Sequence, residues 1–168
     1  MKHLSTLAIM MTCISVLHAQ NAMFVPFGQS ELEVRSYLDD KEYIMRVDEI
    51  RNENKIRSIM EYFITEYSFK DNQLYTIKAT KYYPNKRAAQ EAIQASLMYM
   101  KLLKGEFLEV PSYEWDHHYV IIEEERLIEL KHKRYDSYHE LELSSTSRLH
   151  GPRSRTETLA MQLLEKKR

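Results

Sequence analysis

The fold is decided by the stretch YFITEYSFKDNQLYTIKATKYYPNKRAAQEAIQASLMYMKLLKG, residues 62–105. Its first part alternates polar and apolar residues at a period of two, which is typical of a half-buried strand. Lys70 to Gln73 form the predicted turn, and Leu74 to Tyr82 return as a second strand. After Pro84-Asn85 the period changes to 3.6, so we expect a helix that covers the apolar face of the hairpin.

The ends of this helix are predicted by residues suited to capping. Asn85 can accept a backbone hydrogen bond at the start, and Gly105 can close the end. One apolar stripe runs along the helix and is formed by Ala89, Ile93, Leu97, Met100 and Leu103. This is the best-defined helix in the sequence.

Composition sets limits on the class of protein. A chain of 168 residues is long enough for one domain with a hydrophobic core. Its 24 Lys and Arg residues nearly balance its 25 Asp and Glu residues, which excludes the basic footprint of a general nucleic-acid binder. Twelve Tyr residues against one Trp favour a Tyr-rich antiparallel sheet.

Residues 1–19 are typical of a secretory signal peptide. An apolar run from Leu4 to Leu17 precedes Ala19, a small residue suited to cleavage before Gln20. The run has about 14 residues, fewer than the ~20 that a helix needs to span a bilayer. We therefore expect a cleaved signal, a periplasmic or secreted protein, and no transmembrane segment after signal removal; the alternative is an uncleaved N-terminal anchor. Cys13 is lost with the signal, which leaves a mature chain without cysteine.

A capping box is predicted at Ser30 and Glu33, at the start of a short helix. The surrounding string FGQSELEVRSYL, residues 27–38, resembles the Gly-x-Ser/Thr-x-x-x-Val-x-x-x-Leu opening of small envelope domains of the BLIP-like kind, such as the SmpA-type outer-membrane assembly lipoproteins. The chain departs from that family in lacking the lipobox and the Gly-x-Pro that usually follows the helix. The resemblance implies helices packed on one face of an antiparallel sheet, and a binding role in place of catalysis.

Further strands are predicted on both sides of the central stretch, at residues 42–50, 107–110, 115–122, 127–135 and 138–143, while residues 56–63 fit both a helix and a strand. Leu74–Tyr82 can be aligned with Leu127–Tyr135, which suggests two helix-plus-strands halves. The alternative is a chance likeness between two amphipathic strands. Together these patterns predict an α+β fold, with an antiparallel sheet of about six strands and two or three helices on one face.

The single α+β domain is expected over residues 20–150, followed by a tether and a short amphipathic helix over residues 151–168. Ser154 and Glu157 predict a second capping box. A helix of this length is marginal alone in water, so it must dock on its own sheet or on a partner. The stripe suited to docking is formed by Leu159, Leu163 and Leu164.

One cluster of residues is suited to metal binding or acid–base chemistry. It consists of Asp116, His117, His118, His132 and His139. Hairpin strands could bring His118 near His132, so a metal-dependent hydrolase using His118, His132 and Asp116 is the alternative interpretation. The sequence has no metal-binding spacing motif, no Gly-x-Ser-x-Gly elbow and no Gly-rich phosphate loop. We therefore expect no catalytic residue, no metal and no cofactor.

The surplus tyrosines are candidates for an aromatic platform that binds a peptide or a glycan, although such residues more often cover a sheet face. The candidates are Tyr82, Tyr83, Tyr113, Tyr119, Tyr135 and Tyr138. The sequence as a whole predicts an exported, non-enzymatic binding protein of a Gram-negative envelope, whose partner is another envelope protein or a peptide. A structural domain without a ligand is a further alternative.

Overall fold

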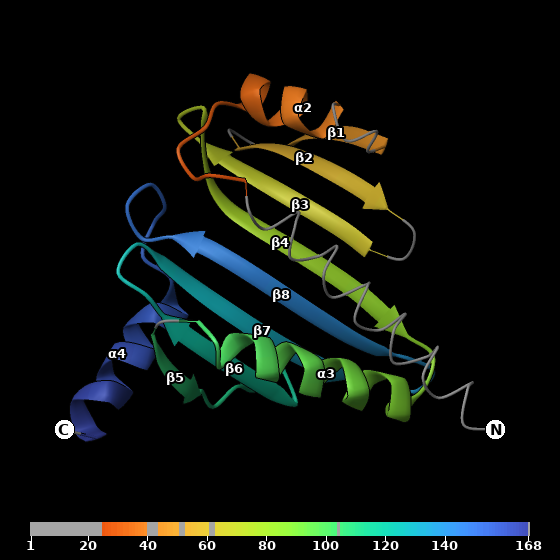
Figure 1. The fold of residues 1–168 in the computed structure, drawn as a ribbon, viewed down its shortest axis with the longest axis vertical. Coiled ribbons are helices and arrows are strands. Elements are labelled where there is room, and N and C mark those ends of the chain that lie inside the picture. The colour runs from red at the N-terminus through yellow and green to blue at the C-terminus, as the bar shows by residue number, and fades with distance from the viewer. Residues whose placement is uncertain (1–24, 40–43, 51–52, 61–62, 104, 168) are drawn as a thin grey trace.

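The described residues form one antiparallel sheet of eight strands in the order β1-β2-β3-β4-β8-β7-β6-β5 (Figure 1). The structure is a computed structural model that describes residues 25–39, 44–50, 53–60, 63–103 and 105–167. The predicted α+β fold is confirmed, with more strands than the six expected. The signal peptide predicted at residues 1–19 lies outside the described residues.

The elements divide into two halves of the same order, a helix followed by four antiparallel strands. The first half contains α2 (Glu31–Asp39), β1 (Ile44–Ile50), β2 (Glu53–Met60), β3 (Phe63–Lys70) and β4 (Gln73–Tyr83). The second half contains α3 (Lys86–Met100), β5 (Glu106–Glu109), β6 (His117–Ile122), β7 (Arg126–Arg134) and β8 (His139–Ser147), and α4 (Arg155–Lys167) follows it. The last strands of the two halves, β4 and β8, pair in the middle of the sheet.

The two predicted halves are present. The sequence alignment of Leu74–Tyr82 with Leu127–Tyr135, which suggested them, does not pair equivalent strands of the two halves. Leu74–Tyr82 lies in β4, the fourth strand of its half, whereas Leu127–Tyr135 begins in β7, the third strand of the other half. Two amphipathic strands resemble each other whatever their position in a sheet, because both alternate at a period of two.

The hairpin of β3 and β4 turns where the sequence predicts it. Asp71 and Asn72 have φ angles of 51° and 59° between the paired residues Lys70 and Gln73. Two residues with positive φ make a type I′ turn, whose twist matches that of the flanking strands. Asp and Asn tolerate this region of backbone conformation better than other side chains do, which explains their presence here.

The predicted start of α3 is confirmed, whereas the predicted end is wrong. The backbone N–H of Ala88 donates to Asn85 Oδ1 at 3.0 Å. The helix ends at Met100, and Gly105 lies instead against β6. A Cβ atom at Gly105 would come within 2.6 Å of Ile121 Cγ2, so the glycine permits a close approach to the sheet.

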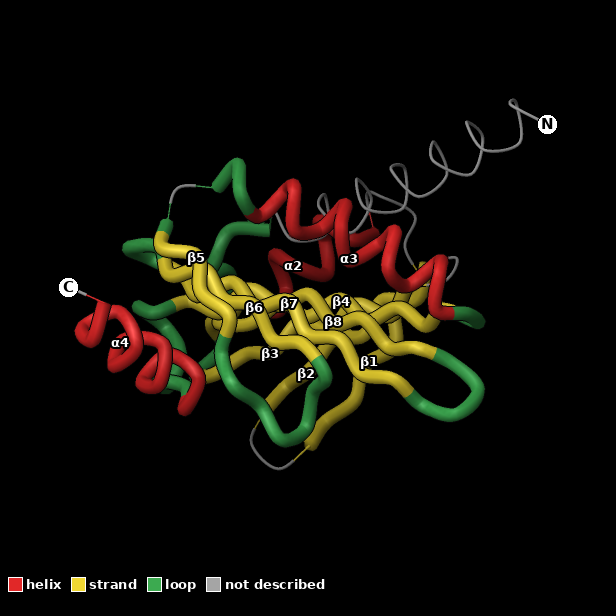
Figure 2. The backbone as a smooth tube through the Cα atoms, turned by 90° about the horizontal axis from the view of Figure 1, so that it is seen from below, coloured by secondary structure: helices red, strands yellow, loops and turns green. Residues whose placement is uncertain are grey.

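The helices lie on both faces of the sheet (Figure 2). Consecutive residues of β6 show the division, because side chains along a strand alternate between faces. Ile121 packs in the cluster beneath α3, whereas Val120 and Ile122 pack in the cluster beneath α4. We call the face beneath α2 and α3 the covered face and the opposite one, where α4 lies at one corner, the open face.

Apolar packing on the covered face uses the predicted stripe of α3. Ala89, Ile93 and Met100 are buried against β7 and β8, where Leu130 and Leu143 lie. A second cluster lies beneath α2 and consists of Val25, Val34, Leu38, Ile56, Tyr67, Phe69, Leu74 and Ile77. The capping box of α2 is confirmed, because Ser30 N donates to Glu33 Oε2 at 2.7 Å and Glu33 N donates to Ser30 Oγ at 3.3 Å.

The terminal helix α4 docks on its own sheet. Leu159, Leu163 and Leu164 pack around the cluster that contains Ala160 and residues of β5 to β7. Its capping box is half formed: Glu157 N donates to Ser154 Oγ at 2.9 Å, while the Glu157 carboxylate accepts from Arg148 Nε at 2.8 Å. The leucine stripe suggested as a partner site is therefore occupied within the chain.

Candidate functional site

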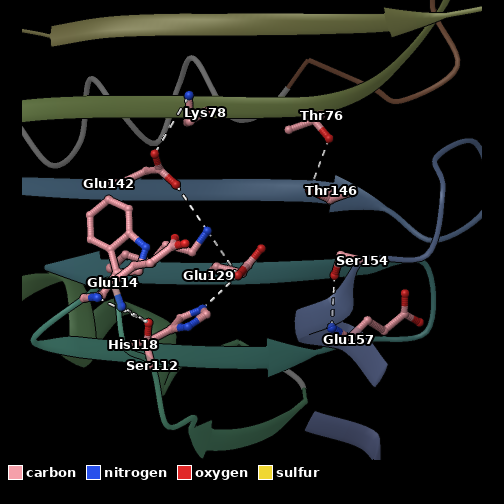
Figure 3. Close-up of polar contacts among 12 residues, drawn as sticks. Thr76, Lys78, Ser112, Glu114, His118, Glu129, Glu142, Thr146, Ser154 and Glu157 are labelled. Carbon is pink, nitrogen blue, oxygen red and sulfur yellow. Dashed lines mark hydrogen bonds and ion pairs between the residues drawn. The ribbon is translucent and has the colours of Figure 1, made fainter. Parts of the chain in front are cut away.

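Charged side chains of alternating sign form a continuous row across the open face, and Figure 3 shows its part from Lys78 to His118. They meet because the antiparallel register places opposite charges on neighbouring strands. This charged row consists of Arg57 on β2, Glu66 on β3, Lys78 on β4, Glu142 on β8, and Lys131 and Glu129 on β7, and His118 on β6 contacts its last member, Glu129.

The end of the row in the first half is partly exposed. Arg57 Nη2 lies 2.8 Å from Glu66 Oε2, and Lys78 Nζ lies 3.0 Å from Glu66 Oε1. A longer contact of 3.9 Å joins Lys78 Nζ to Glu142 Oε2 across the boundary between the halves. The Lys78 side chain is 35% exposed, so solvent screens this end and its pairs contribute little to stability.

The other end of the row is buried. Lys131 Nζ lies 3.2 Å from Glu129 Oε2 and 3.3 Å from Glu142 Oε1, and His118 Nε2 lies 2.7 Å from Glu129 Oε2. Burial alone would raise the pKa of Glu129, but the His118 hydrogen bond and the Lys131 charge bring it below its usual value. Burial works against the charge of Lys131, yet Glu129 and Glu142 raise its pKa. Both groups are therefore ionised at neutral pH.

This buried end lies beside a pocket of about 490 Å³ between α4 and the loop that joins β5 to β6. Trp115, Tyr113 and Leu159 supply apolar walls, and His118 and Lys131 also line the pocket. We call it the Trp115 pocket. An apolar concavity with a few convergent polar groups, some with perturbed pKa values, is the usual form of a ligand site.

The loop that carries Trp115 is held in place by its own hydrogen bonds. Ser112 Oγ accepts from the backbone N–H groups of Glu114 and Trp115, each at 3.2 Å (Figure 3). Lys131 Nζ lies 5.8 Å from the centroid of the Trp115 ring, within the range of a cation–π interaction. The indole is thereby fixed beside the buried end of the charged row.

The structure separates His118 from the other two residues of the predicted metal site, whereas Asp116 and His132 stay close, with Asp116 N donating to His132 O at 2.9 Å. In the register of β6 and β7, His118 pairs with Lys131, whereas His132 pairs with His117. His118 therefore faces the open face and His132 the covered face, so the expectation that the hairpin brings them together is wrong. Asp116 Oδ2 accepts from Arg134 N at 2.6 Å. No group of three or more His, Cys, Asp or Glu residues suited to a metal ion occurs among the described residues.

Three histidines instead form a row on the covered face. His132 Nε2 lies 3.0 Å from His139 Nδ1, and the His132 ring stacks on His117 with centroids 5.7 Å apart. His132 and His139 are each 8% exposed. Burial lowers the pKa of His132, and the neighbouring His139 and His117 lower it further, which keeps the ring neutral.

The predicted tyrosine platform is divided among three places. Tyr138 stacks on Tyr135 with centroids 4.5 Å apart and meets the edge of Tyr82 at 5.5 Å. Tyr82 lies on the same side of β4 as the charged row, so this trio is on the open face. Tyr119 faces α3, and Tyr113 lies in the Trp115 pocket.

The trio and the pocket are connected along β7. Lys131 lies over the Trp115 ring. Lys133 is two residues further along β7 and therefore lies on the same face. Its Nζ lies 5.4 Å from the centroid of the Tyr135 ring. We call this surface, from Trp115 to the trio, the aromatic band. The sequence interpretation missed Trp115, Lys131 and Leu159 as pocket residues; the single Trp in a Tyr-rich chain was the one signal available.

Comparison of the chain with protein-family models, curated proteins and solved structures finds no match. Among the described helices, none is long and apolar enough to cross a membrane. The resemblance at residues 27–38 to small envelope domains stays a prediction.

Proposed function

We propose that this protein is an exported, non-enzymatic binding protein of a Gram-negative cell envelope, periplasmic or secreted, which holds a segment of a partner polypeptide on its open face. The observation that carries the proposal is the Trp115 pocket, a hollow on the open face whose apolar walls are Trp115, Tyr113 and Leu159. Export is supported by the apolar run that precedes Ala19. Anchoring of a partner by aromatic side chains in desolvated pockets is common at protein interfaces.

The charge on the open face favours a polypeptide over a polyanion. The three cations of the charged row, Arg57, Lys78 and Lys131, are balanced by the carboxylates of Glu66, Glu129 and Glu142. Such a self-neutralised row gives little long-range attraction for nucleic acid or an anionic surface. The aromatic band adds an elongated surface, which suits an extended polypeptide segment better than it suits a small molecule.

Site-specific photo-crosslinking in the native envelope tests the proposal. A photoreactive phenylalanine analogue replaces Tyr113 or Tyr138 on the open face, and Leu102, which is 83% exposed after α3, serves as the matched control. We expect one protein to be captured from both open-face positions and not from Leu102. The purified partner should then change the fluorescence of Trp115, the only tryptophan of the chain. Equal capture from all three positions, or no change in Trp115 emission, would contradict the proposal.

A second candidate function is a small hydrolase, which the His118–Glu129 contact favours. A histidine held by a buried carboxylate beside a pocket is the usual arrangement of a general base. In this reading His118 Nδ1 takes a proton from water, the water oxygen attacks the carbonyl carbon of an ester, and the departing alkoxide then receives the proton. Turnover of a panel of chromogenic esters, abolished by His118→Gln, would favour this candidate, and absence of turnover would remove it.

A further inference from the structure

We propose that the Trp115 pocket recognises a primary carboxamide, the side chain of Gln or Asn, on the bound segment. The inference rests on the proposed function, because it requires a polypeptide segment to enter the pocket. It follows from the hydrogen-bonding groups that His118 and Lys131 present beside the apolar walls.

His118 presents an acceptor. Its Nε2 lies 2.7 Å from Glu129 Oε2, and an ionised carboxylate can only accept, so Nε2 carries the hydrogen. With its hydrogen on Nε2, the neutral form of the ring has its lone pair on Nδ1. Among the described residues, Nδ1 of His118 has no hydrogen-bond partner. The atom is also not fully enclosed by the protein. Since His118 lines the pocket, this acceptor is available to a ligand there.

Lys131 presents a donor next to this acceptor. Its ammonium group has three N–H bonds, of which Glu129 and Glu142 use two, at 3.2 Å and 3.3 Å. The remaining bond is free for a ligand, and Lys131 also lines the pocket. Lys131 and His118 are directly paired on β7 and β6, which places their Cβ atoms about 5 Å apart. Both side chains also approach the same oxygen, Glu129 Oε2, His118 through Nε2 at 2.7 Å and Lys131 through Nζ at 3.2 Å, so their polar ends lie close together.

A primary carboxamide matches this pair, because its carbonyl oxygen and one of its N–H bonds lie on the same edge. A trans peptide unit does not, since its C=O and N–H point in opposite directions. A carboxylate would place a second acceptor against the lone pair of His118. Trp115 and Leu159 can pack the methylene groups that precede the amide.

The pocket should discriminate strongly between a carboxamide and other side chains. A ligand without the matching atoms leaves the polar groups of His118 and Lys131 unpaired, which weakens its binding. Four acetylated, amidated pentapeptides that differ only in their central residue test this. The central residue is Gln, Asn, Glu or Met, the last being an apolar side chain of similar length. Binding to the wild-type protein is followed by Trp115 fluorescence and by NMR chemical shifts.

We expect the Gln or Asn peptide to bind at least about tenfold more tightly than the Met and Glu peptides. His118→Phe should reduce this ratio to about one, and Lys131→Met serves the same purpose where His118→Phe fails to fold. Met98→Ala, on α3 and 70% exposed, should keep the ratio. If all four peptides bind equally, the carboxamide inference fails while polypeptide binding stands; if none binds, the inference is overturned and the crosslinking experiment decides the proposed function separately.

Discussion

The two faces of the sheet bury polar groups in opposite ways. On the covered face, His132 is buried between His117 and His139 and stays neutral, with its Nδ1 buried and without a hydrogen-bond partner among the described residues. On the open face, Glu129 is as deeply buried, yet it stays charged because His118 and Lys131 surround it. Burial excludes a charge only where no partner compensates for the lost hydration. Stability should therefore depend on packing beneath α3 on one face and on ionisation around Glu129 on the other.

The largest difference between the faces should appear when packing is removed. Leu130, 1% exposed, lies in the cluster beneath α3. Leu130→Ala should lower the free energy of unfolding by about 3 kcal/mol, because it leaves a cavity that the surrounding side chains fill only in part. Urea unfolding followed by circular dichroism measures the change.

A matched variant on the open face of the same strand sharpens this comparison. Lys133 lies three residues from Leu130 and on the other side of β7. Lys133→Ala should change the free energy of unfolding by no more than about 0.5 kcal/mol, the usual range for surface positions. Similar losses for the two variants would show that the open face is packed as tightly as the covered face.

Removal of a buried charge should have the next largest effect. Glu129→Gln keeps the shape of the side chain but removes the carboxylate that pairs with His118 and Lys131. Hydrogen bonds to charged groups contribute about 2 kcal/mol, so a loss of that size is expected at pH 7.

The loss at Glu129 should depend on pH with a defined sign. The pKa of this carboxyl is lowered from 4.5 in the folded protein, so its contribution is complete above 4.5 and is lost as the pH falls through the folded value. Wild type and Glu129→Gln should therefore differ fully at pH 6 and converge toward pH 3. A difference in melting temperature that stays constant over this range would count against ionisation of Glu129.

Local patterns were enough to predict the central hairpin, its turn and the start of α3. Asp71 and Asn72 suit a tight turn, and Asn85 caps the helix through a residue three positions away. Gly105 was misread because its constraint comes from β6, a strand more than ten residues further along the chain. A close approach of two segments leaves no periodic signal in either one.

The candidate site was harder to predict, because it depends on register. A shift of one residue in strand pairing moves a side chain to the other face. That single step separates His118 from His132 and joins His118 to Lys131. The tyrosine trio was partly predicted from composition. The position of Trp115 beside α4 follows from the docking of that helix on its own sheet, whereas the sequence left open whether the helix docks there or on a partner.

The smallest predicted effect concerns His132. The pKa of this ring is lowered from 6.5 by burial first and then by His139, His117 and Arg134, while Asp116 acts in the opposite direction. The unfolded chain therefore binds a proton at mildly acidic pH more readily than the folded one, and stability is lost as the pH falls below about 6.5. His132→Phe removes this term, so its melting temperature should fall less between pH 7.5 and 5.5 than that of the wild type.

The pH slope is the readout for His132, since the absolute stability of the variant also changes when His139 loses its partner. His150→Gln, after β8 and beside Gly28, has no contact with this row among the described residues; it is the matched control and should keep the wild-type slope. The range from pH 7.5 to 5.5 lies above the acid range in which Glu129 titrates, so the two faces respond in separate windows. Equal slopes for wild type and His132→Phe would mean that the covered face accepts a proton on its histidine row without cost, and the contrast between the faces would then be limited to packing.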